Sequence, residues 1–312
     1  MNYRVLVTCP PMLGLINEFR HLFTEKSIDL HCPLVKQTLS VEELKELLPQ
    51  FDGWIIGDDP ANAEVFKAGH QGKLKAAVKW GVGVDNVDFK AAKELGIPIT
   101  NTPRMFGGEV ADVAVGYVIG LARQTFWIDR EVRKGNWIKP SGTSLAGKTV
   151  ALVGFGDIGR NTAKRLLAFD LKVIAYDPYF QAQDNLSQVE SSIWPNRLEE
   201  ADFIVLTCAL TADNYHLLNA DIFAKVKPAV KIVNVARGPL IDESSLIDAL
   251  SSGQVDSAAL DVFEVEPLPL DSPLRGFEQC IFGSHNSSNT VDAVRRASHQ
   301  AIALLFDFLG VS

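Results

Sequence analysis

Short apolar runs alternate with amphipathic stretches along the chain. The runs YRVLVT, GWII and LKAAVKW have the length of buried strands. The stretches VEELKELL and VDFKAAKELG carry apolar residues at helical spacing, and they end near Pro49 and Gly96. Because strands that alternate with helices form parallel sheets with crossover connections, the pattern predicts an α/β protein rather than a sandwich or a helix bundle.

The alternation begins anew in the second half of the chain. A long helical stretch from about Glu109 to Arg133 precedes the segment GNWIKPSGTSLAGKT, which we interpret as a connection between domains. Further apolar runs follow it, beginning with KTVALV and LKVIAYD. A length of 312 residues is about right for two domains, so we expect two doubly wound parallel sheets.

The strand expected at 149–153 runs into the glycine pattern GFGDIG, and a helix follows it. Gly154 permits a tight turn, Gly156 lets the backbone approach a pyrophosphate, and Gly159 allows the helix to pack on the strand. The next strand ends in Asp177, close to the roughly 20-residue distance expected for an acid that binds ribose hydroxyls. The pattern predicts a dinucleotide site, to which Phe155, Asp157 and Ile158 also belong.

The segment after Asp177, DPYFQAQD, contains no Lys or Arg that could neutralise a 2′-phosphate, so NAD is favoured over NADP. A methyltransferase could also present a glycine turn with a distal acid, and that class stays open at this point. Tight binding of S-adenosylmethionine without binding of NADH would favour the methyltransferase.

Each later apolar run delivers polar residues at its C-terminal end, where open α/β sheets place their ligands. One cleft should therefore receive a cation, two carboxylates and an imidazole beside the nicotinamide. The strand-end residues concerned are Thr207, Cys208 and Ala209, then Ala236 and Arg237, then Asp261 and Glu266, and finally His285.

These motifs together resemble the D-isomer-specific 2-hydroxyacid dehydrogenase family over essentially the whole chain. The matching segments are GVGVDNVD, NTP, GFGDIG, NVARGPLID, LDVFEVEPLP and SH. The resemblance implies a flavodoxin-like substrate-binding domain at 1–101 and 288–312, with a Rossmann NAD-binding domain inserted at 102–287. A C-terminal helix around 290–309 would return to the first domain. The resemblance also implies an NAD-dependent enzyme that forms a homodimer, with the helix from Glu109 and the loop carrying Trp127 and Trp137 as candidate contacts.

Reduction of a 2-keto acid requires a cation that holds the carboxylate, a hydride donor and a proton donor. Arg237 suits the first task and His285 the last, with Glu266 fixing the imidazole tautomer and stabilising its charged form. Asp261 matches the family position that binds the nicotinamide carboxamide. Glu264 is expected to be solvated, and the other five histidines, His216 among them, are expected to be surface or core residues.

The substrate side of the site carries departures from phosphoglycerate dehydrogenases. Places where those enzymes tend to have arginines hold Trp80 and Gly57 here, and two acids, Asp58 and Asp59, follow. We therefore expect a small acid such as glyoxylate or hydroxypyruvate, although Arg104 could compensate and make D-3-phosphoglycerate dehydrogenase the alternative. The glycines that flank Val82, Gly81 and Gly83, would turn backbone N–H groups toward a substrate carboxylate.

Composition and charge narrow the function further. A net charge of −8 and the absence of clustered Lys and Arg argue against a nucleic-acid surface. The four cysteines lack the spacing of a zinc site, so no metal is expected, and they fit a reduced, cytoplasmic setting. No apolar stretch is long enough for a membrane span or resembles a signal peptide.

One alternative from outside the enzymes stays open. Some members of this fold sense NAD as corepressors and retain much of the catalytic triad, so Arg237, Glu266 and His285 do not exclude that role. NAD-dependent capture of a partner without turnover of any keto acid would favour such a binding protein.

Overall fold

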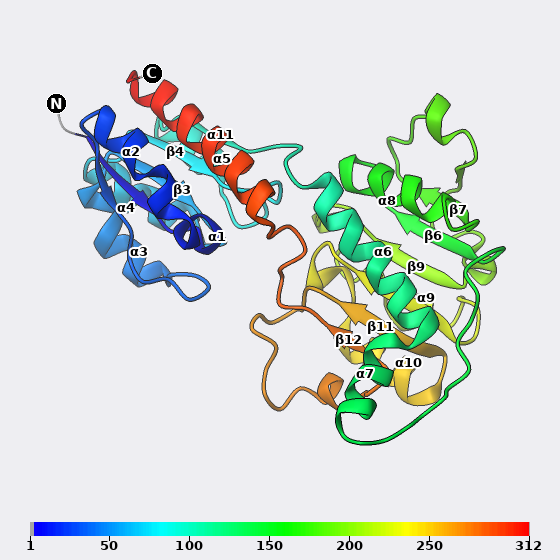
Figure 1. Cartoon of the computed structure of the whole chain (residues 1–312). Helices are drawn as coiled ribbons and strands as arrows, with labels where there is room; N and C mark the ends of the chain where they lie inside the picture. The colour runs from blue at the N-terminus through cyan, green and yellow to red at the C-terminus, as the bar shows by residue number, and fades with distance from the viewer. Residues whose placement is uncertain (1–2, 312) are drawn as a thin grey trace. The chain divides into compact units, whose positions relative to one another are not determined.

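The computed structural model describes residues 3–311, which divide into two compact units. Unit 1 contains the described residues up to Met105 and those from Asn289 onward, and unit 2 comprises Phe106–Ser288. In Figure 1 unit 1 carries the blue, cyan and red ends of the colour range, and unit 2 carries the green to orange middle.

Unit 1 is a parallel five-stranded sheet with helices on its faces. Its strand order is β2-β1-β3-β4-β5, the flavodoxin-like arrangement. One buried cluster joins the sheet to α3, α4 and α5, and the C-terminal helix α11 packs on β3 and β4. The strands are β1 (Arg4–Val7), β2 (Asp29–His31), β3 (Gly53–Ile56), β4 (Ala76–Lys79) and β5 (Ile99–Asn101). The helices are α1 (Pro10–Gly14), α2 (Ile16–Glu25), α3 (Val41–Leu47), α4 (Ala63–Gln71), α5 (Phe89–Glu94) and α11 (Val291–Leu309).

Unit 2 is a parallel seven-stranded sheet with the order β12-β11-β10-β9-β6-β7-β8. Helices α6 and α8 pack on each other, and α9 and α10 pack together and contribute to the main core cluster (Figure 1). The strands are β6 (Thr149–Val153), β7 (Lys172–Tyr176), β8 (Glu190–Ser191), β9 (Phe203–Leu206), β10 (Val230–Asn234), β11 (Val255–Leu260) and β12 (Ile281–Phe282). The helices are α6 (Gly107–Arg123), α7 (Thr125–Arg133), α8 (Asp157–Leu167), α9 (Ala220–Phe223) and α10 (Glu243–Ser252).

The central strands are buried on both faces, which explains why they are continuous apolar runs in the sequence rather than alternating ones. Polar residues cap the starts of several helices. Ser40 forms a capping box with Glu43 at the start of α3, and Thr290 accepts a hydrogen bond from the backbone nitrogen of Ala293 in α11.

Two expectations from the sequence are wrong. The segment 135–149 lies inside unit 2 and connects no domains, because its residue Thr143 donates its backbone N–H to the carbonyl of Ala122 at 2.8 Å and so docks on α6. The long helix expected from Glu109 is two helices, since Gln124 adopts a left-handed conformation with φ of 55° between α6 and α7.

Strand β6 lies between β9 and β7, so the strand order of unit 2 reverses beside it. Ligands of open α/β sheets bind at such switch points, outside the carboxyl ends of the strands. Within the described residues, no helix is long and apolar enough to cross a membrane.

Candidate active site

A glycine-rich turn joins β6 to α8 at the switch point. Gly154 has a φ of 94°, and a Cβ there would lie 2.6 Å from the backbone nitrogen of Cys208. A Cβ on Gly159 would lie 2.1 Å from the carbonyl oxygen of Gly154, so only glycine lets the helix approach this closely. A Cβ on Gly156, in contrast, would meet no atom within 4 Å at the exposed start of α8. The turn is tight against the sheet and open at the helix N-terminus, which fits a dinucleotide pyrophosphate.

The other residues of the turn use their side chains for packing. The buried ring of Phe155 lies against that of Phe180, with centroids 4.9 Å apart. The Asp157 carboxylate abuts Gly107 of α6, where a Cβ would lie 2.4 Å from Oδ2, and Ile158 is half-buried. Asp157 and Ile158 can therefore offer a cofactor chiefly their backbone N–H groups, whereas the N–H of Phe155 is donated to Asp177.

The Asp177 carboxylate, just after β7, ties the second strand to the glycine turn. Its Oδ2 accepts a hydrogen bond from the backbone nitrogen of Phe155 at 2.6 Å, and its Oδ1 accepts one from that of Tyr179 at 2.8 Å. Each carboxylate oxygen has a second lone pair, so the side chain can still accept from a ribose hydroxyl.

The residues after β9 close the other side of the switch point. The Thr207 hydroxyl lies 2.9 Å from the carbonyl oxygen of Gly154 and is buried. Burial raises the pKa of the Cys208 thiol to about 11, so this side chain stays protonated near neutral pH. Ala209 is exposed, and its carbonyl accepts a hydrogen bond from Asn214 at 2.8 Å. Hydrogen bonds from Thr207 thus tie this strand end to the glycine turn.

Arg237 follows β10, and its backbone is fixed by the last residue of that strand. The amide of Asn234 donates to the carbonyl of Arg237 at 2.9 Å and accepts from the backbone nitrogen of Ala236 at 3.0 Å. A Cβ on Gly238 would lie 1.9 Å from the carbonyl carbon of Phe263, so the loops after β10 and β11 touch there. This close approach brings the backbone after Arg237, a half-buried residue, against the segment that carries Glu266.

His285 and Glu266 form an ion-pair geometry within unit 2. Nδ1 of His285 lies 2.8 Å from Oε2 of Glu266, and both side chains are about one quarter exposed. Oε1 of Glu266 accepts a hydrogen bond from the backbone nitrogen of Phe263 at 3.0 Å. The carboxylate is held by its own loop and can fix the orientation of the imidazole, the arrangement that acid–base catalysis by histidine requires.

Asp261 is 1% exposed, and the structure gives it partners that the sequence did not suggest. Its oxygens accept hydrogen bonds from the backbone nitrogens of Asn286 at 3.2 Å and Ser287 at 2.9 Å. The expected contact with the nicotinamide carboxamide stays a prediction. What the contacts establish is that Asp261 anchors the loop that carries His285.

The segment that carries Glu266 holds a second carboxylate paired with a histidine, and this pair corrects the expectation that Glu264 is solvated. Nε2 of His216 lies 2.5 Å from Oε1 of Glu264, so this glutamate is paired rather than merely solvated. The ring of Tyr215 stacks on His216 with centroids 4.0 Å apart. His216 and Glu264 are both about 30% exposed, and no motif in the sequence had indicated a partner for this histidine.

At the carboxyl ends of the strands of unit 1 the structure shows a cation that sequence reasoning missed. Lys79, at the end of β4, is 2% exposed and donates to the carbonyl of Gly57 at 2.7 Å and to the Asp58 carboxylate at 2.9 Å. A lysine within the apolar run AAVKW was the available signal. Asp59 is fully buried and accepts from the backbone nitrogen of Leu39 at 2.8 Å and from the Thr8 hydroxyl, and burial raises its pKa.

The other residues expected on the substrate side differ in their contacts and in their exposure to solvent. The indole nitrogen of Trp80 donates to the Ser298 hydroxyl of α11 at 3.1 Å, and the ring is buried, so it packs on that helix. The backbone N–H of Gly81 is already donated to Thr102 at 2.8 Å, which corrects the expectation that it turns toward a substrate. Val82 is 40% exposed, Gly83 is half-buried, and Arg104 is exposed with a φ of 57°.

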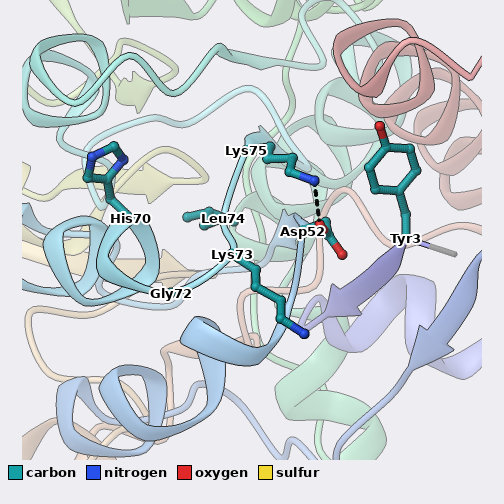
Figure 2. Close-up of a pocket in the computed structure, with 7 residues that line it drawn as sticks. All are labelled: Tyr3, Asp52, His70, Gly72, Lys73, Leu74 and Lys75. Atoms are coloured by element: carbon teal, nitrogen blue, oxygen red, sulfur yellow. Dashed lines mark ion pairs between the residues drawn. The ribbon is translucent and has the colours of Figure 1, made fainter. Parts of the chain in front are cut away.

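A surface pocket at the opposite, amino ends of the same strands contains none of the expected site residues. Figure 2 shows Tyr3 before β1, Asp52 before β3 and Lys75 before β4 among the lining residues. Asp52 pairs with Lys75 at 2.9 Å and accepts from the backbone nitrogen of Arg4 at 3.0 Å, so its carboxylate ties three strand starts together. The Asp52–Lys75 pair of this pocket is thus explained by the sheet itself.

Comparison with known proteins agrees with this geometry. Residues 115–287 match the family model of the D-isomer specific 2-hydroxyacid dehydrogenase, NAD binding domain. The chain is 36% identical over 316 aligned positions to a hydroxypyruvate reductase of Thermotoga maritima, covering 99% of each protein. It is 36% identical over 282 positions to human D-3-phosphoglycerate dehydrogenase, covering 88% of this chain and 52% of the human protein.

Solved structures show the same likeness. The TT0316 protein from Thermus thermophilus has a TM-score of 0.86 at 30% identity, over 98% of this chain and 97% of that one. A glyoxylate reductase from Paecilomyes thermophila has a TM-score of 0.84 at 26% identity, over 98% of this chain and 95% of that one. The chain therefore belongs to the D-isomer-specific 2-hydroxyacid dehydrogenases, and it is an NAD-dependent oxidoreductase of that family.

Proposed function

We propose that this dehydrogenase reversibly reduces a small 2-keto acid with an uncharged side chain, of the glyoxylate or hydroxypyruvate type. The observation that carries the proposal is the 2.8 Å contact between His285 and Glu266, in the same unit as the glycine turn. A histidine held in this way by a carboxylate is suited to move a proton near neutral pH.

The proposed reaction divides its tasks among three side chains. The bound nicotinamide supplies or takes up the hydride. During reduction His285 gives a proton to the carbonyl oxygen from Nε2, because Nδ1 faces Glu266. Glu266 fixes the ring and favours its charged form, while Arg237 grips the substrate carboxylate with its planar fork and polarises the carbonyl.

The choice of NADH over NADPH rests on Asp177. Its carboxylate is fixed by two backbone N–H groups beside the glycine turn, so a 2′-phosphate would meet a like charge. We expect turnover with NADH to exceed turnover with NADPH at equal concentration. Equal turnover with both would contradict this assignment.

The proposed substrate class follows from the charges at the strand ends of unit 1. The ammonium of Lys79 is matched there by the carboxylate of Asp58, and this pair carries no net charge for a dianionic phosphate. Relatives named hydroxypyruvate reductase and glyoxylate reductase support a small substrate. The alternative is 3-phosphohydroxypyruvate, for which Lys79 and Arg104 are the available cations.

Assembly and location are part of the same proposal. We expect a homodimer in which α7 and the following loop make contacts, because Trp137 is 80% exposed and Phe126 and Val132 are more than 40% exposed. Light scattering at the mass of a single chain would exclude it. We expect a reducing, cytoplasmic setting because the four cysteines are free thiols, and cell fractionation would test this.

The deciding experiment measures NADH consumption with glyoxylate, hydroxypyruvate, pyruvate and 3-phosphohydroxypyruvate. We expect the uncharged substrates to be preferred, and His285→Ala to lower turnover by roughly 10²–10⁴-fold with little change in NADH binding. Preference for the phosphorylated substrate would favour the alternative enzyme. Binding of NADH without turnover of any acid would favour a corepressor-like protein instead.

A further inference from the structure

The Tyr117 hydroxyl on α6 and the Asp261 carboxylate after β11 meet in the interior of unit 2. A carboxylate that is 1% exposed is costly unless several donors bind it. Two of its donors are the backbone N–H groups of Asn286 and Ser287, and a third is the Tyr117 hydroxyl. Because the tyrosine comes from a helix outside the loop, its hydrogen bond links the loop to α6.

His285 stands directly before the two anchored residues. Its backbone nitrogen donates to the carbonyl oxygen of Asp261 at 2.6 Å, so three consecutive residues of the loop donate backbone hydrogen bonds to Asp261. The φ of His285 is 54°, a left-handed conformation that costs a non-glycine residue energy and persists when its surroundings enforce it. The orientation of the imidazole therefore depends on how firmly Asp261 holds this loop.

The tyrosine hydroxyl and the Asp261 carboxylate both lie close to the backbone of Gly283 in the same loop. A Cβ at this position would lie 2.1 Å from Oδ1 of Asp261 and 2.5 Å from the hydroxyl oxygen of Tyr117. The space that a side chain at 283 would need is thus occupied by the hydrogen-bonded pair. Burial, followed by the negative charge of Asp261 and its hydrogen bond, raises the pKa of Tyr117, so the hydroxyl remains a donor at any working pH.

We propose that Tyr117 is a positioning residue for His285, which it holds in place through Asp261. The inference rests on the proposed role of His285 as the proton donor. Without the hydroxyl, the buried carboxylate keeps only the loop's own N–H groups as partners, and it can move with the loop instead of anchoring it to α6. The residue before His285 is Ser284, whose φ is not fixed as that of a proline would be. The contacts to Asp261 therefore hold the backbone of this turn.

The test is Tyr117→Phe, which removes one hydroxyl and leaves the ring. We expect kcat for the best keto acid to fall about tenfold, the effect of losing one hydrogen bond to a charged group. NADH should still bind, because the glycine turn and Asp177 are unaffected, and its Kd is measured alongside because Asp261 is also the predicted contact of the nicotinamide carboxamide. The matched control is Tyr176→Phe. In the wild type the Tyr176 hydroxyl donates to the carbonyl of Asn196 at 2.7 Å in the same unit.

The control separates positioning from stability. Both variants lose one tyrosine hydrogen bond and should melt at a lower temperature, Tyr117→Phe the more because its acceptor is charged, but only Tyr117→Phe should lose kcat. Equal losses of kcat in both variants, or a kcat within about twofold of wild type for Tyr117→Phe, would overturn the inference.

The route through Asp261 is tested by a double-mutant cycle. In the Asp261→Asn background, Tyr117→Phe should have little further effect on kcat, whereas independent, multiplied effects would overturn the coupling. If Tyr117→Phe does not fold, Asp261→Asn alone takes its place, since it removes the charged acceptor of the same hydrogen bond, and an unchanged kcat would then refute the inference. His285→Ala is measured alongside: if it keeps full turnover, the proposed function itself fails, whatever Tyr117→Phe does.

Discussion

Replacing Glu266 by glutamine tests the histidine–carboxylate pair with the least change of shape. The carboxylate now accepts two hydrogen bonds, from Nδ1 of His285 at 2.8 Å and from the backbone nitrogen of Phe263 at 3.0 Å. A glutamine amide has only one oxygen, so it can accept from one of these groups and must turn its NH₂ toward the other. If the oxygen stays with Phe263, the NH₂ faces Nδ1, and the imidazole can no longer carry a proton there.

The size of the effect follows from what the pair loses. A hydrogen bond to a charged group contributes about 1.5–3 kcal/mol, and the charged imidazolium also loses the attraction of the carboxylate. Because about 1.4 kcal/mol corresponds to a factor of ten, we expect Glu266→Gln to lower kcat for keto-acid reduction by about 10- to 100-fold. Binding of NADH should change little, since the glycine turn belongs to a different part of unit 2.

Glu264→Gln is the matched control for this prediction. It makes the same substitution two residues earlier in the same loop, on a carboxylate that pairs with His216 instead. Stopped-flow single turnover with saturating NADH and keto acid measures the hydride step in both variants and the wild type. The reasoning would be refuted if Glu266→Gln stayed within about twofold of the wild-type rate, or if both variants lost the same factor.

Three other substitutions probe different parts of the chain. Gly159→Ala places a Cβ against the carbonyl of Gly154, so it should cost about 1–3 kcal/mol of unfolding free energy and weaken NADH binding, and an unchanged Kd in a fluorescence titration would contradict this. Asp58→Asn removes the carboxylate that pairs with the buried lysine at the end of β4, so the preference for 3-phosphohydroxypyruvate over hydroxypyruvate should rise about tenfold in kcat/KM. An unchanged ratio would place the pair outside the substrate site. Burial raises the pKa of Asp202, but its bonds to Lys227 and to the backbone outweigh this and leave the pKa lowered. The stability that Asp202 contributes is therefore present above its unfolded pKa of about 3.9 and is lost in acid, so Asp202→Asn should cost about 1–2 kcal/mol in urea unfolding at neutral pH, with a difference that shrinks below about pH 4.

The fold class could be predicted because parallel strands buried on both faces are continuous apolar runs, and each run is followed by a helical pattern. Strand β6 begins and ends at the expected bounds, since the glycine pattern marks its end, and helix α11 lies within a residue of the range that the family resemblance implied. The break at Gln124 carried no such mark. A single left-handed glutamine interrupts a stretch whose apolar spacing continues on both sides, so the local pattern contains no stop signal.

The candidate site was predictable where its residues follow strand ends and unpredictable where they sit within elements. Arg237 and His285 come directly after apolar runs, and the carboxyl ends of parallel strands converge. Tyr117 lies in the middle of α6, and only the three-dimensional approach of α6 to β11 and β12 brings its hydroxyl to Asp261. Lys79 is inside a strand, where a charged residue signals a buried partner but does not identify it.

The two glutamates before Pro267 show why residue spacing alone could not assign partners. In an extended strand, Glu264 and Glu266 would point to the same face, and one histidine could not be favoured over the other. The segment after β11 is not a strand, however: Oε1 of Glu266 accepts from the backbone nitrogen of Phe263, which folds the loop back on itself. Glu264 instead donates its backbone N–H to Glu243 at 2.7 Å, at the start of α10, and its carboxylate is directed to His216. The fold of this loop, rather than the distance along the chain, decides which glutamate reaches His285. Comparing Glu266→Gln with Glu264→Gln therefore tests whether that pairing controls the reaction.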